Sequence, residues 1–209
     1  MVSARDSILG RLRMSGATAR LPHSDPLALQ PLPRRSINDC VRRFRQEAEL
    51  LGVECFVEDS AEYVRARLES IIAGRRLLSW DPEQLPHGAG ALVGSATLGR
   101  AARADQADAE VGVTGCDAAI AETASLVMLS GPGRSRTASL LPPVHVALVQ
   151  RDQFCFSLGE FFATSRARLR QSPSCTLITG PSRTADIELT LTLGIHGPGR
   201  VIVIVGPDS

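Results

Sequence analysis

The chain has 209 residues, of which 44% are hydrophobic, and its charged side chains balance to a formal net charge of +1. This is enough apolar material for one domain with a substantial buried core. Because the arginines are spread along the chain and the charges nearly cancel, the sequence argues against nucleic-acid binding and against binding to anionic membranes.

The apolar runs and the cysteines indicate the cellular compartment of the protein. The run "VIVIV" at 201–205 is far shorter than the roughly 20 residues that span a bilayer, so no membrane span is expected. Residues 1–14 carry charges among their apolar positions and lack the core of a secretory signal, which predicts a cytoplasmic protein. The cysteines fit neither a disulfide framework nor a metal or iron–sulfur motif, so we expect reduced thiols and no metal site; they are Cys40, Cys55, Cys116, Cys155 and Cys175.

The N-terminal segment, residues 1–35, is expected to be separate from the domain that follows. A short amphipathic helix is predicted over residues 3–14. Four prolines between residues 21 and 35 remove backbone donors and fix φ, so this stretch is predicted to run as an extended arm. The arm has leucines that can pack on its own domain or on a neighbouring subunit, and the second case corresponds to a homodimer.

Residues 36–209 are predicted to form a single α/β domain. A helix over 36–52, a strand over 53–57, a helix over 60–74 and a strand over 75–80 follow one another, and this alternation indicates a parallel sheet flanked by helices. Ser36 and Ser60 are the expected helix caps. Residues 81–99 are rich in Gly and Pro and are expected to form a loop with short elements.

The second half of the chain is predicted to complete the same sheet. Apolar runs predict strands over 109–115, 125–130, 144–149, 175–179 and 201–205. One helical turn is expected over 116–121 and one helix over 157–169. Alternating apolar residues favour a further strand over 187–195.

Three glycine-marked loops follow or join these strands: "VTGCDAAIAET" at 113–123, "ITGPSRTADIE" at 178–188 and "GIHGPGR" at 194–200. In an open parallel sheet, ligands bind outside the carboxyl ends of the strands, where loops converge. We therefore expect the three loops to form one site. Thr114, Gly115 and Gly197 are candidate ligand-binding residues within it.

The second loop has the composition of an anion site. Gly180 allows close approach of backbone to a ligand, Ser182 and Thr184 offer hydroxyls, and Arg183 offers a forked cation, which suits a small carboxylate or a phosphorylated metabolite. Asp186 is expected to orient Arg183 or to contact substrate hydroxyls. The alternative is that the hydroxyls cap a turn and Asp186 pairs with Arg183, with no ligand involved.

Two residues are candidates for catalysis. Glu122 lies between the predicted turn and the strand that follows, where a carboxylate can act as a covalent nucleophile or general base; the alternative is a solvated or salt-bridged carboxylate. His196, flanked by glycines, is a candidate for proton transfer. The loop at 130–143 contains Arg134 and Arg136, which can close over an acidic ligand, or the loop can simply be solvated.

The motifs "GVTGCDAAIAET", "SLLPPVHVALV", "TGPSRTADIE" and "GIHGP", in this order within residues 110–205, resemble the LUD-domain proteins of the lactate utilization protein C type. The resemblance implies a fold similar to the sugar-phosphate isomerase, CoA-transferase and formyltetrahydrofolate cyclo-ligase group. It also implies a role in the bacterial oxidation of L-lactate to pyruvate. In that system sister subunits carry the iron–sulfur clusters, which agrees with the lack of a cysteine motif in this chain.

One position departs from the family pattern. The family usually has Gly two residues after the motif glutamate, whereas this chain has Ala124. In the CoA transferases, which the fold group includes, the glutamate before x-Gly is the covalent nucleophile, so the departure weakens that role for Glu122. The alternatives are therefore a CoA-transferase-like or cyclo-ligase-like enzyme that uses Glu122, and a metabolite sensor without catalysis. The sequence identifies no cofactor and leaves open whether the chain is an enzyme by itself.

Overall fold

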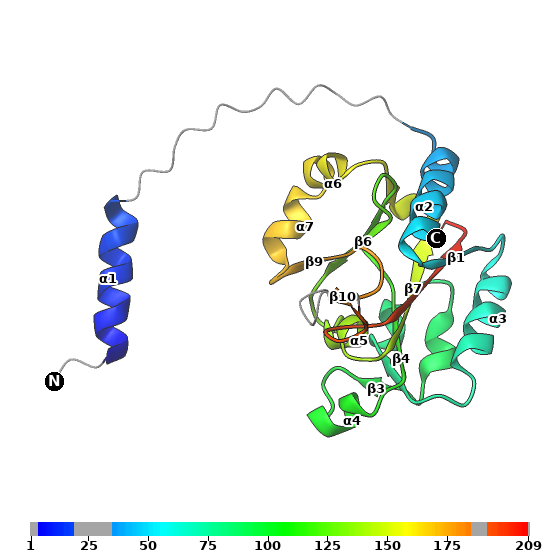
Figure 1. Ribbon diagram of the computed structural model, residues 1–209, viewed down its shortest axis with the longest axis horizontal. Helices are drawn as coiled ribbons and strands as arrows, with labels where there is room; N and C mark the ends of the chain where they lie inside the picture. Colours follow the sequence, from blue (N-terminus) through cyan, green and yellow to red (C-terminus); the bar gives the residue numbers. More distant parts are fainter. Residues whose placement is uncertain (1–3, 19–34, 185–191, 209) are drawn as a thin grey trace. The chain divides into compact units, whose positions relative to one another are not determined.

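The computed structural model describes residues 4–18, 35–184 and 192–208. The chain divides into two units, Met1–Pro33 and Arg34–Ser209. In the first unit, the helix expected near the N-terminus is present as α1 (Ala4–Thr18) and continues past its predicted end (Figure 1). The predicted proline-rich arm lies outside the described residues except at Arg35.

The two predicted helices at the start of the second unit are confirmed together with their caps. Helix α2 (Ile37–Leu51) begins after Ser36, whose hydroxyl accepts a hydrogen bond from the backbone N–H of Asp39, and it ends at Gly52 in the left-handed conformation. Helix α3 (Ala61–Ile72) is capped by Ser60 in the same way. Each cap satisfies a backbone donor that the first turn of a helix leaves unpaired.

A six-stranded sheet forms the centre of the second unit, and all of its neighbouring strands are parallel. This confirms the prediction of an α/β fold with a mostly parallel sheet flanked by helices. In spatial order the strands are β1 (Glu54–Val57), β12 (Arg200–Gly206), β7 (Val144–Gln150), β4 (Val111–Thr114), β2 (Leu77–Ser79) and β3 (Thr97–Leu98).

Both faces of this sheet are covered, as expected for near-continuous apolar strands. On one face, α3 and the 3-10 helix η2 (Ala89–Val93) pack on residues such as Val113 and Ile204. On the other face, α2 packs on residues such as Val203 together with strands of a second sheet. The short helix α5 (Thr137–Leu140) packs on β4 and β7.

The second sheet has four strands and was not expected from the sequence. Its order is β8 (Phe154–Cys155), β5 (Ala118–Ile120), β6 (Ser125–Leu129) and β9 (Cys175–Ile178). The β5–β6 and β6–β9 pairs are antiparallel. The expectation that 125–130 and 175–179 complete the central sheet is therefore wrong, because these strands pair with each other and lie across one face of it.

Two local predictions are also wrong. Residues 116–121 do not form a helical turn, because β5 is held between β6 and β8. The single helix predicted over 157–169 is two helices, α6 (Leu158–Thr164) and α7 (Arg166–Gln171), with a break at Ser165. Figure 1 shows α6 and α7 beside the second sheet.

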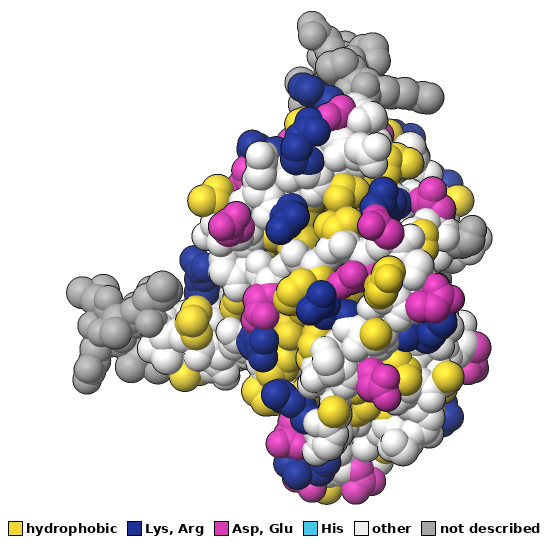
Figure 2. Space-filling view, turned by 90° about the vertical axis from the view of Figure 1, so that its right-hand side faces the viewer, with side chains coloured by type: hydrophobic (Ala, Val, Ile, Leu, Met, Phe, Trp, Pro, Cys, Tyr) yellow, Lys and Arg dark blue, Asp and Glu magenta, His cyan; other side chains and the backbone are white. Residues whose placement is uncertain are grey.

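Short elements occupy the connecting segments. They are η1 (Pro82–Gln84), α4 (Arg103–Ala107), η3 (Arg151–Gln153) and the hairpin of β10 (Arg183–Thr184) with β11 (Thr192–Leu193). The strand predicted over 187–195 lies partly outside the described residues, and β11 is its described part. On the face in Figure 2, acidic and basic side chains are interspersed, in keeping with the balanced composition.

Candidate functional site

A pocket lies where loops leave the carboxyl ends of β2 and β3. Its volume is about 260 Å³, and it is lined by Asp81, Gly99, Arg100, Gly131, Gly133, Arg134 and Ser135. Asp81 follows β2, Arg100 follows β3, and the remaining residues come mostly from the glycine-containing loop after β6. This is the edge of a parallel sheet at which ligands are generally bound. We call it the Arg100–Arg134 pocket.

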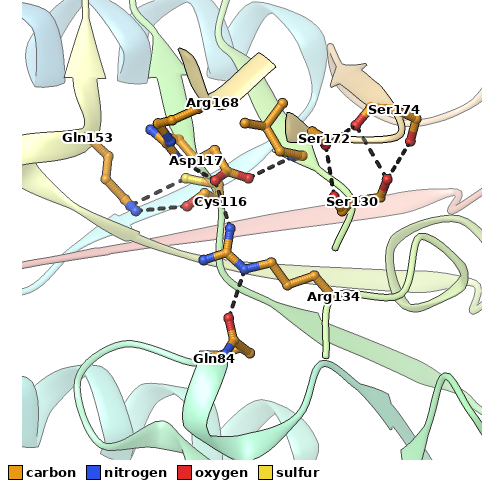
Figure 3. Close-up of polar contacts among 10 residues, drawn as sticks. Gln84, Cys116, Asp117, Ser130, Arg134, Gln153, Arg168, Ser172 and Ser174 are labelled. Carbon is orange, nitrogen blue, oxygen red and sulfur yellow. Dashed lines mark hydrogen bonds and ion pairs between the residues drawn. The ribbon is translucent and has the colours of Figure 1, made fainter. Parts of the chain in front are cut away.

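Arg134 is held in a fixed position by Gln84 and Asp117, which Figure 3 shows, and by Trp80. Its Nε donates to Oε1 of Gln84 at 2.9 Å, and its Nη1 donates to Oδ1 of Asp117 at 2.8 Å. Its guanidinium also lies over the ring of Trp80, 5.3 Å from the ring centroid. Among the described residues Nη2 has no hydrogen-bond partner, so this donor remains available to a ligand.

Asp117 is the buried anchor of this arrangement. Its side chain is 1% exposed and accepts hydrogen bonds from Arg134, from Arg168 of α7, and from the backbone N–H of Leu129 at 2.7 Å. A buried carboxylate is tolerated when such partners compensate its lost hydration. Asp117 therefore connects the end of β4, the loop after β6 and α7 at one point.

The backbone next to Asp117 is also fixed. The Gln153 side chain donates from Nε2 to the carbonyl of Cys116 at 2.7 Å, and the Cys116 thiol lies 3.4 Å from Oε1 of the same side chain. Burial raises the pKa of the Cys116 thiol well above its usual value. Cys116 is therefore a packed neutral thiol and not a reactive one.

Asp81 and Arg100 form an ion pair in the wall of the pocket. Nη1 of Arg100 donates to both carboxylate oxygens of Asp81, at 2.8 and 2.9 Å. The loop after β6 is tied to the same region, since the N–H of Asp81 donates to the carbonyl of Gly133 at 2.8 Å and Nε1 of Trp80 donates to the carbonyl of Ser135 at 3.2 Å. The walls of the pocket are thus joined by hydrogen bonds.

Gly133 is needed for this close approach. Its φ is +72°, and a Cβ at this position would lie 3.1 Å from side-chain atoms of Asp81 and Gln84. Other residues rarely adopt such a φ, and a side chain here would also press against Asp81 and Gln84. The glycine-rich composition of the 130–136 segment therefore has a structural cause at this edge.

The predicted loops at 178–188 and 194–200 meet, but at the other end of the central sheet. The N–H of Ser182 donates to the carbonyl of Pro198 at 2.8 Å, and the N–H of Gly194 donates to the carbonyl of Ser182 at 3.0 Å. A Cβ added at Gly197 would lie 3.4 Å from Cβ of Ser182. This segment leads into β12, whereas Thr114 is at the carboxyl end of the parallel strand β4.

The remaining residues of these loops are differently placed. Gly180, with φ +84°, lies against Leu51, and Arg183 is exposed and donates from Nη2 to the Leu51 carbonyl. Thr184 is buried in the β10–β11 hairpin, and His196 is exposed. Asp186 lies outside the described residues.

Thr114 and Gly115 are at the carboxyl end of β4 but face the interior. The Thr114 hydroxyl is 2.9 Å from Nε2 of the buried His145. Burial lowers the pKa of His145 to about 4. A Cβ at Gly115 would lie 3.3 Å from the Trp80 ring. These two residues support the packing behind the pocket.

Glu122 follows β5, whereas Asp117 precedes it, so the two carboxylates lie at opposite ends of this strand. Its Oε1 accepts from the backbone N–H of Leu158, the first residue of α6, at 3.3 Å. A carboxylate is favoured at that end of a helix.

The expectation that all three loops meet at one rim is met only in part. The start of the first loop, at the carboxyl end of β4, lies at the opposite end of the central sheet from the segment that leads into β12. The end of the first loop does approach the second loop, through hydrogen bonds that join the hydroxyls of Thr123, Ser125 and Thr179.

Sequence reasoning identified Arg134 as a residue that can contact an acid, but it missed Asp81, Arg100 and Asp117. Asp117 lies within the motif "GVTGCDAAIAET", and this motif was the one feature of the sequence that could have marked Asp117 as a site residue. Asp81 and Arg100 carry no such signal, because each belongs to a loop without a pattern. Their proximity follows only from the β4–β2–β3 strand order.

Two further features are absent from the described residues. No cluster of three or more His, Cys, Asp or Glu side chains suited to a metal ion is found there. No helix in this part of the chain has both the length and the apolar character needed to cross a membrane.

Comparison with known proteins gives a consistent result. The family model described as LUD domain matches residues 95–205, more than half of the chain. A "Lactate utilization protein C" of Exiguobacterium sp. is 38% identical over 104 residues, covering 48% of this chain and 45% of that protein. A protein with the same name from Anoxybacillus flavithermus is 32% identical over 165 residues, covering 73% of this chain and 74% of that protein.

The matched part of the chain thus spans less than half the length of some curated relatives and about three quarters of others. Among solved structures, a DUF162 family protein from Deinococcus radiodurans superposes with a TM-score of 0.66 at 23% identity. The superposition covers 82% of this chain and 99% of that one. At this identity the match supports the fold alone.

Proposed function

The chain belongs to the LUD domain family, and from this premise we propose that it is a component of a bacterial lactate utilisation system that binds a small organic acid in the Arg100–Arg134 pocket. The name of its relatives, "Lactate utilization protein C", supports the role. The observation that carries the binding proposal is the fixed position of Arg134 beside Arg100, with donors of both guanidinium groups unoccupied among the described residues.

The charges around the pocket fit a monoanion. Arg100, Arg134 and Arg168 supply three positive charges, and Asp81 and Asp117 supply two negative charges, which leaves one positive charge over this cluster. Guanidinium groups bind carboxylates well because their N–H donors match the two oxygens. A volume of about 260 Å³ is sufficient for an acid of a few carbons.

The family also suggests the pathway and the partners of the chain. The chain would act in the cytoplasm in the oxidation of L-lactate to pyruvate, with iron–sulfur subunits as partners. Residues 36–209 would form the LUD-type domain, and residues 1–35 would lie across their own domain or across a second copy in a homodimer. Co-purification of the full chain with a partner rich in cysteine clusters tests this assembly.

A binding experiment tests the pocket. L-lactate is titrated into the full chain by calorimetry, and the same titration is made with Arg100→Ala and with Arg134→Lys. Arg45, exposed on α2, supplies the control variant Arg45→Ala. We expect binding to weaken about tenfold or more in the pocket variants and to be unchanged in the control. Equal affinity in all four proteins would place the acid elsewhere.

The loop around Ser182 is the first alternative position, with Gly180, Arg183, Thr184, Asp186 and Gly197 as its ligand-binding candidates. In that case Arg183→Ala would weaken L-lactate binding while Arg100→Ala would not. His196 is the candidate for proton transfer at this loop.

A growth experiment tests the biological role independently of the binding measurement. A deletion strain should fail to grow on L-lactate, and the wild-type gene should restore growth whereas the Arg100→Ala gene should not.

One observation favours a second candidate function at Glu122. Ala124, at the position where the family has Gly, adopts φ +49°, a left-handed conformation that glycine adopts freely. The turn after Glu122 therefore keeps a glycine-like backbone, which supports our second proposal, a CoA-transferase-like or cyclo-ligase-like reaction through Glu122.

Incubation with acetyl-CoA followed by intact-mass measurement tests whether Glu122 acts as a covalent nucleophile, with Glu122→Gln as the control. Binding of L-lactate with no turnover by the chain or its complex would instead support a metabolite sensor.

A further inference from the structure

We propose that Asp81 determines the specificity of the Arg100–Arg134 pocket by selecting a 2-hydroxy acid over the corresponding 2-oxo acid. This inference rests on the proposed function, because it assumes that the pocket binds a small organic acid. It goes beyond that function by assigning a role to the carboxylate in the pocket wall. Asp81 is the acidic member of a lining that otherwise contains two arginines, a serine and three glycines.

The position of Asp81 is well defined. Its backbone N–H donates to the carbonyl of Gly133, and its carboxylate oxygens both accept from Nη1 of Arg100. Its side chain is 21% exposed, so it is partly shielded while still accessible from the pocket. A ligand that enters the pocket therefore meets a fixed carboxylate.

Arg100 keeps binding capacity while it is paired with Asp81. Among the described residues its hydrogen bonds to Asp81 use only Nη1, and its side chain is 69% exposed. Its Nε and Nη2 donors can therefore receive a ligand carboxylate while Nη1 stays on Asp81. A ligand carboxylate on this edge would share the Arg100 guanidinium with the Asp81 carboxylate, so that a substituent next to the ligand carboxylate could reach toward Asp81.

A hydroxyl next to the ligand carboxylate makes this arrangement favourable. An ionised carboxylate only accepts hydrogen bonds, whereas a hydroxyl can donate one. A 2-hydroxy acid can thus give its carboxylate to Arg100 and Arg134 and donate its hydroxyl to Asp81. A 2-oxo acid has a carbonyl oxygen at the same place, so two acceptors would face each other without a proton between them.

The same argument disfavours a phosphorylated ligand. A phosphate group carries between one and two negative charges near neutral pH and has no carbon-bound hydroxyl in the position that faces Asp81. Its second charge would lie beside the Asp81 carboxylate. The cluster of three arginines and two aspartates has one positive charge in excess and therefore matches a monocarboxylate better.

A matched set of C3 acids tests the proposal. L-lactate, pyruvate and propionate are titrated into the full chain at one pH and ionic strength. We expect L-lactate to bind about tenfold more tightly than pyruvate or propionate. This ratio is at the low end of the free-energy cost of an unpaired polar group, because Asp81 is partly solvated. In Asp81→Asn the side-chain amide can donate to a carbonyl, so the lactate-to-pyruvate ratio should fall to about threefold or less.

Glu83 provides the control because it is an exposed carboxylate two residues away that does not line the pocket. Glu83→Gln changes the net charge by the same amount and should leave the ratio at its wild-type value. Asp81→Ala, which can neither donate nor accept, is the second variant and should also lose the preference for L-lactate. Thermal unfolding of each variant checks that the fold is retained.

The outcomes separate this inference from the proposed function. If L-lactate and pyruvate bind equally well and both depend on Arg100, the pocket binds acids and the role of Asp81 is refuted. The role is equally refuted if the ratio is unchanged in Asp81→Asn. If none of the three acids binds, the proposed function itself fails, and the specificity proposal fails with it.

Discussion

Nη1 of Arg134 donates to Oδ1 of Asp117 at 2.8 Å, and this ion pair joins the glycine-containing loop after β6 to the segment between β4 and β5. Arg168 of α7 reaches the same oxygen from another side. One buried carboxylate thus fixes two cations that come from distant parts of the chain. The orientation of Arg134 in the pocket is therefore a property of the fold that exists before any ligand arrives.

The first prediction concerns this carboxylate. Asp117→Asn keeps the shape of the side chain but removes its charge, so Arg134 and Arg168 lose their common partner. We expect the free energy of unfolding to fall by about 1–3 kcal/mol, less than for a fully buried pair because both arginines are partly exposed. L-lactate binding should also weaken. Urea unfolding and calorimetry measure the two effects.

Glu62→Gln is the control for this prediction, since Glu62 is 73% exposed and pairs with Arg65 on the surface of α3. Its free energy of unfolding should stay close to that of the wild type, because water and salt screen an exposed pair. If Asp117→Asn were as stable as Glu62→Gln, the buried ion cluster would not contribute to stability as argued.

The second prediction concerns the contact between β4 and α5. A Cβ at Gly112 in β4 would lie 1.8 Å from the carbonyl oxygen of Ala138 in α5. The obstacle is backbone, so it cannot rotate away, and α5 must move off the sheet. We expect Gly112→Ala to lower the free energy of unfolding by about 3 kcal/mol or more, near the upper end for overpacking.

Gly94 is the matched control because a Cβ there would meet no atom within 4 Å and its φ of −58° suits alanine. Gly94→Ala should be neutral or slightly stabilising. The comparison is made by thermal unfolding of the two variants and the wild type. Similar Tm values for both variants would contradict the close contact between β4 and α5.

The elements predicted correctly are those with a local signal. The caps at Ser36 and Ser60 and the apolar strands of the central sheet depend on neighbouring residues in the chain, so pattern and propensity identify them. The segment at 116–121 was misread because its alanines favour a helix, whereas pairing of β5 with β6 and β8 decides the structure.

The candidate site was less predictable for a related reason. Arg134 stood out because a glycine-rich loop surrounds it, but its partner Asp117 comes from a segment 17 positions earlier and Arg168 from one 51 positions after Asp117. Such a cluster is created by tertiary structure. The loops around Ser182 and His196 looked alike in composition, yet composition does not reveal at which end of a parallel strand a loop lies.

The third prediction concerns the turn after Glu122. Ala124 is 2% exposed and has φ +49°, a conformation that β-branched residues strongly disfavour. Ala124→Val should therefore lower the free energy of unfolding by about 2–4 kcal/mol, through backbone strain added to overpacking. Ala124→Gly should stay within about 1 kcal/mol of the wild type, because relief of strain offsets the lost methyl group.

Ala119→Val separates the two contributions. Ala119 is fully buried in β5, where extended backbone suits valine, so this variant adds the same volume without the strained φ. Chemical denaturation of both variants should show a larger loss for Ala124→Val. If Ala119→Val were the more damaging substitution, crowding and not backbone conformation would dominate at this turn.

The fourth prediction is a dependence of stability on pH. His145 is fully buried on β7, its Nδ1 has no hydrogen-bond partner among the described residues, and burial lowers its pKa from 6.5 to about 4. The unfolded chain therefore takes up a proton near pH 6.5 that the folded chain refuses until about pH 4. Stability attributable to His145 is complete above pH 6.5 and falls by roughly 3 kcal/mol as the pH drops through this window.

Unfolding by urea at pH 7.5, 6.5, 5.5 and 4.5 measures this loss, and His145→Gln supplies the comparison because glutamine does not titrate and can still bond to Thr114. The variant should lose much less stability between pH 6.5 and 4.5 than the wild type. A smaller slope of the same sign should remain, since burial also lowers the pKa of His87. Parallel pH profiles for the two proteins would mean that His145 is protonated in the folded state and that water or a rearranged neighbour reaches its ring.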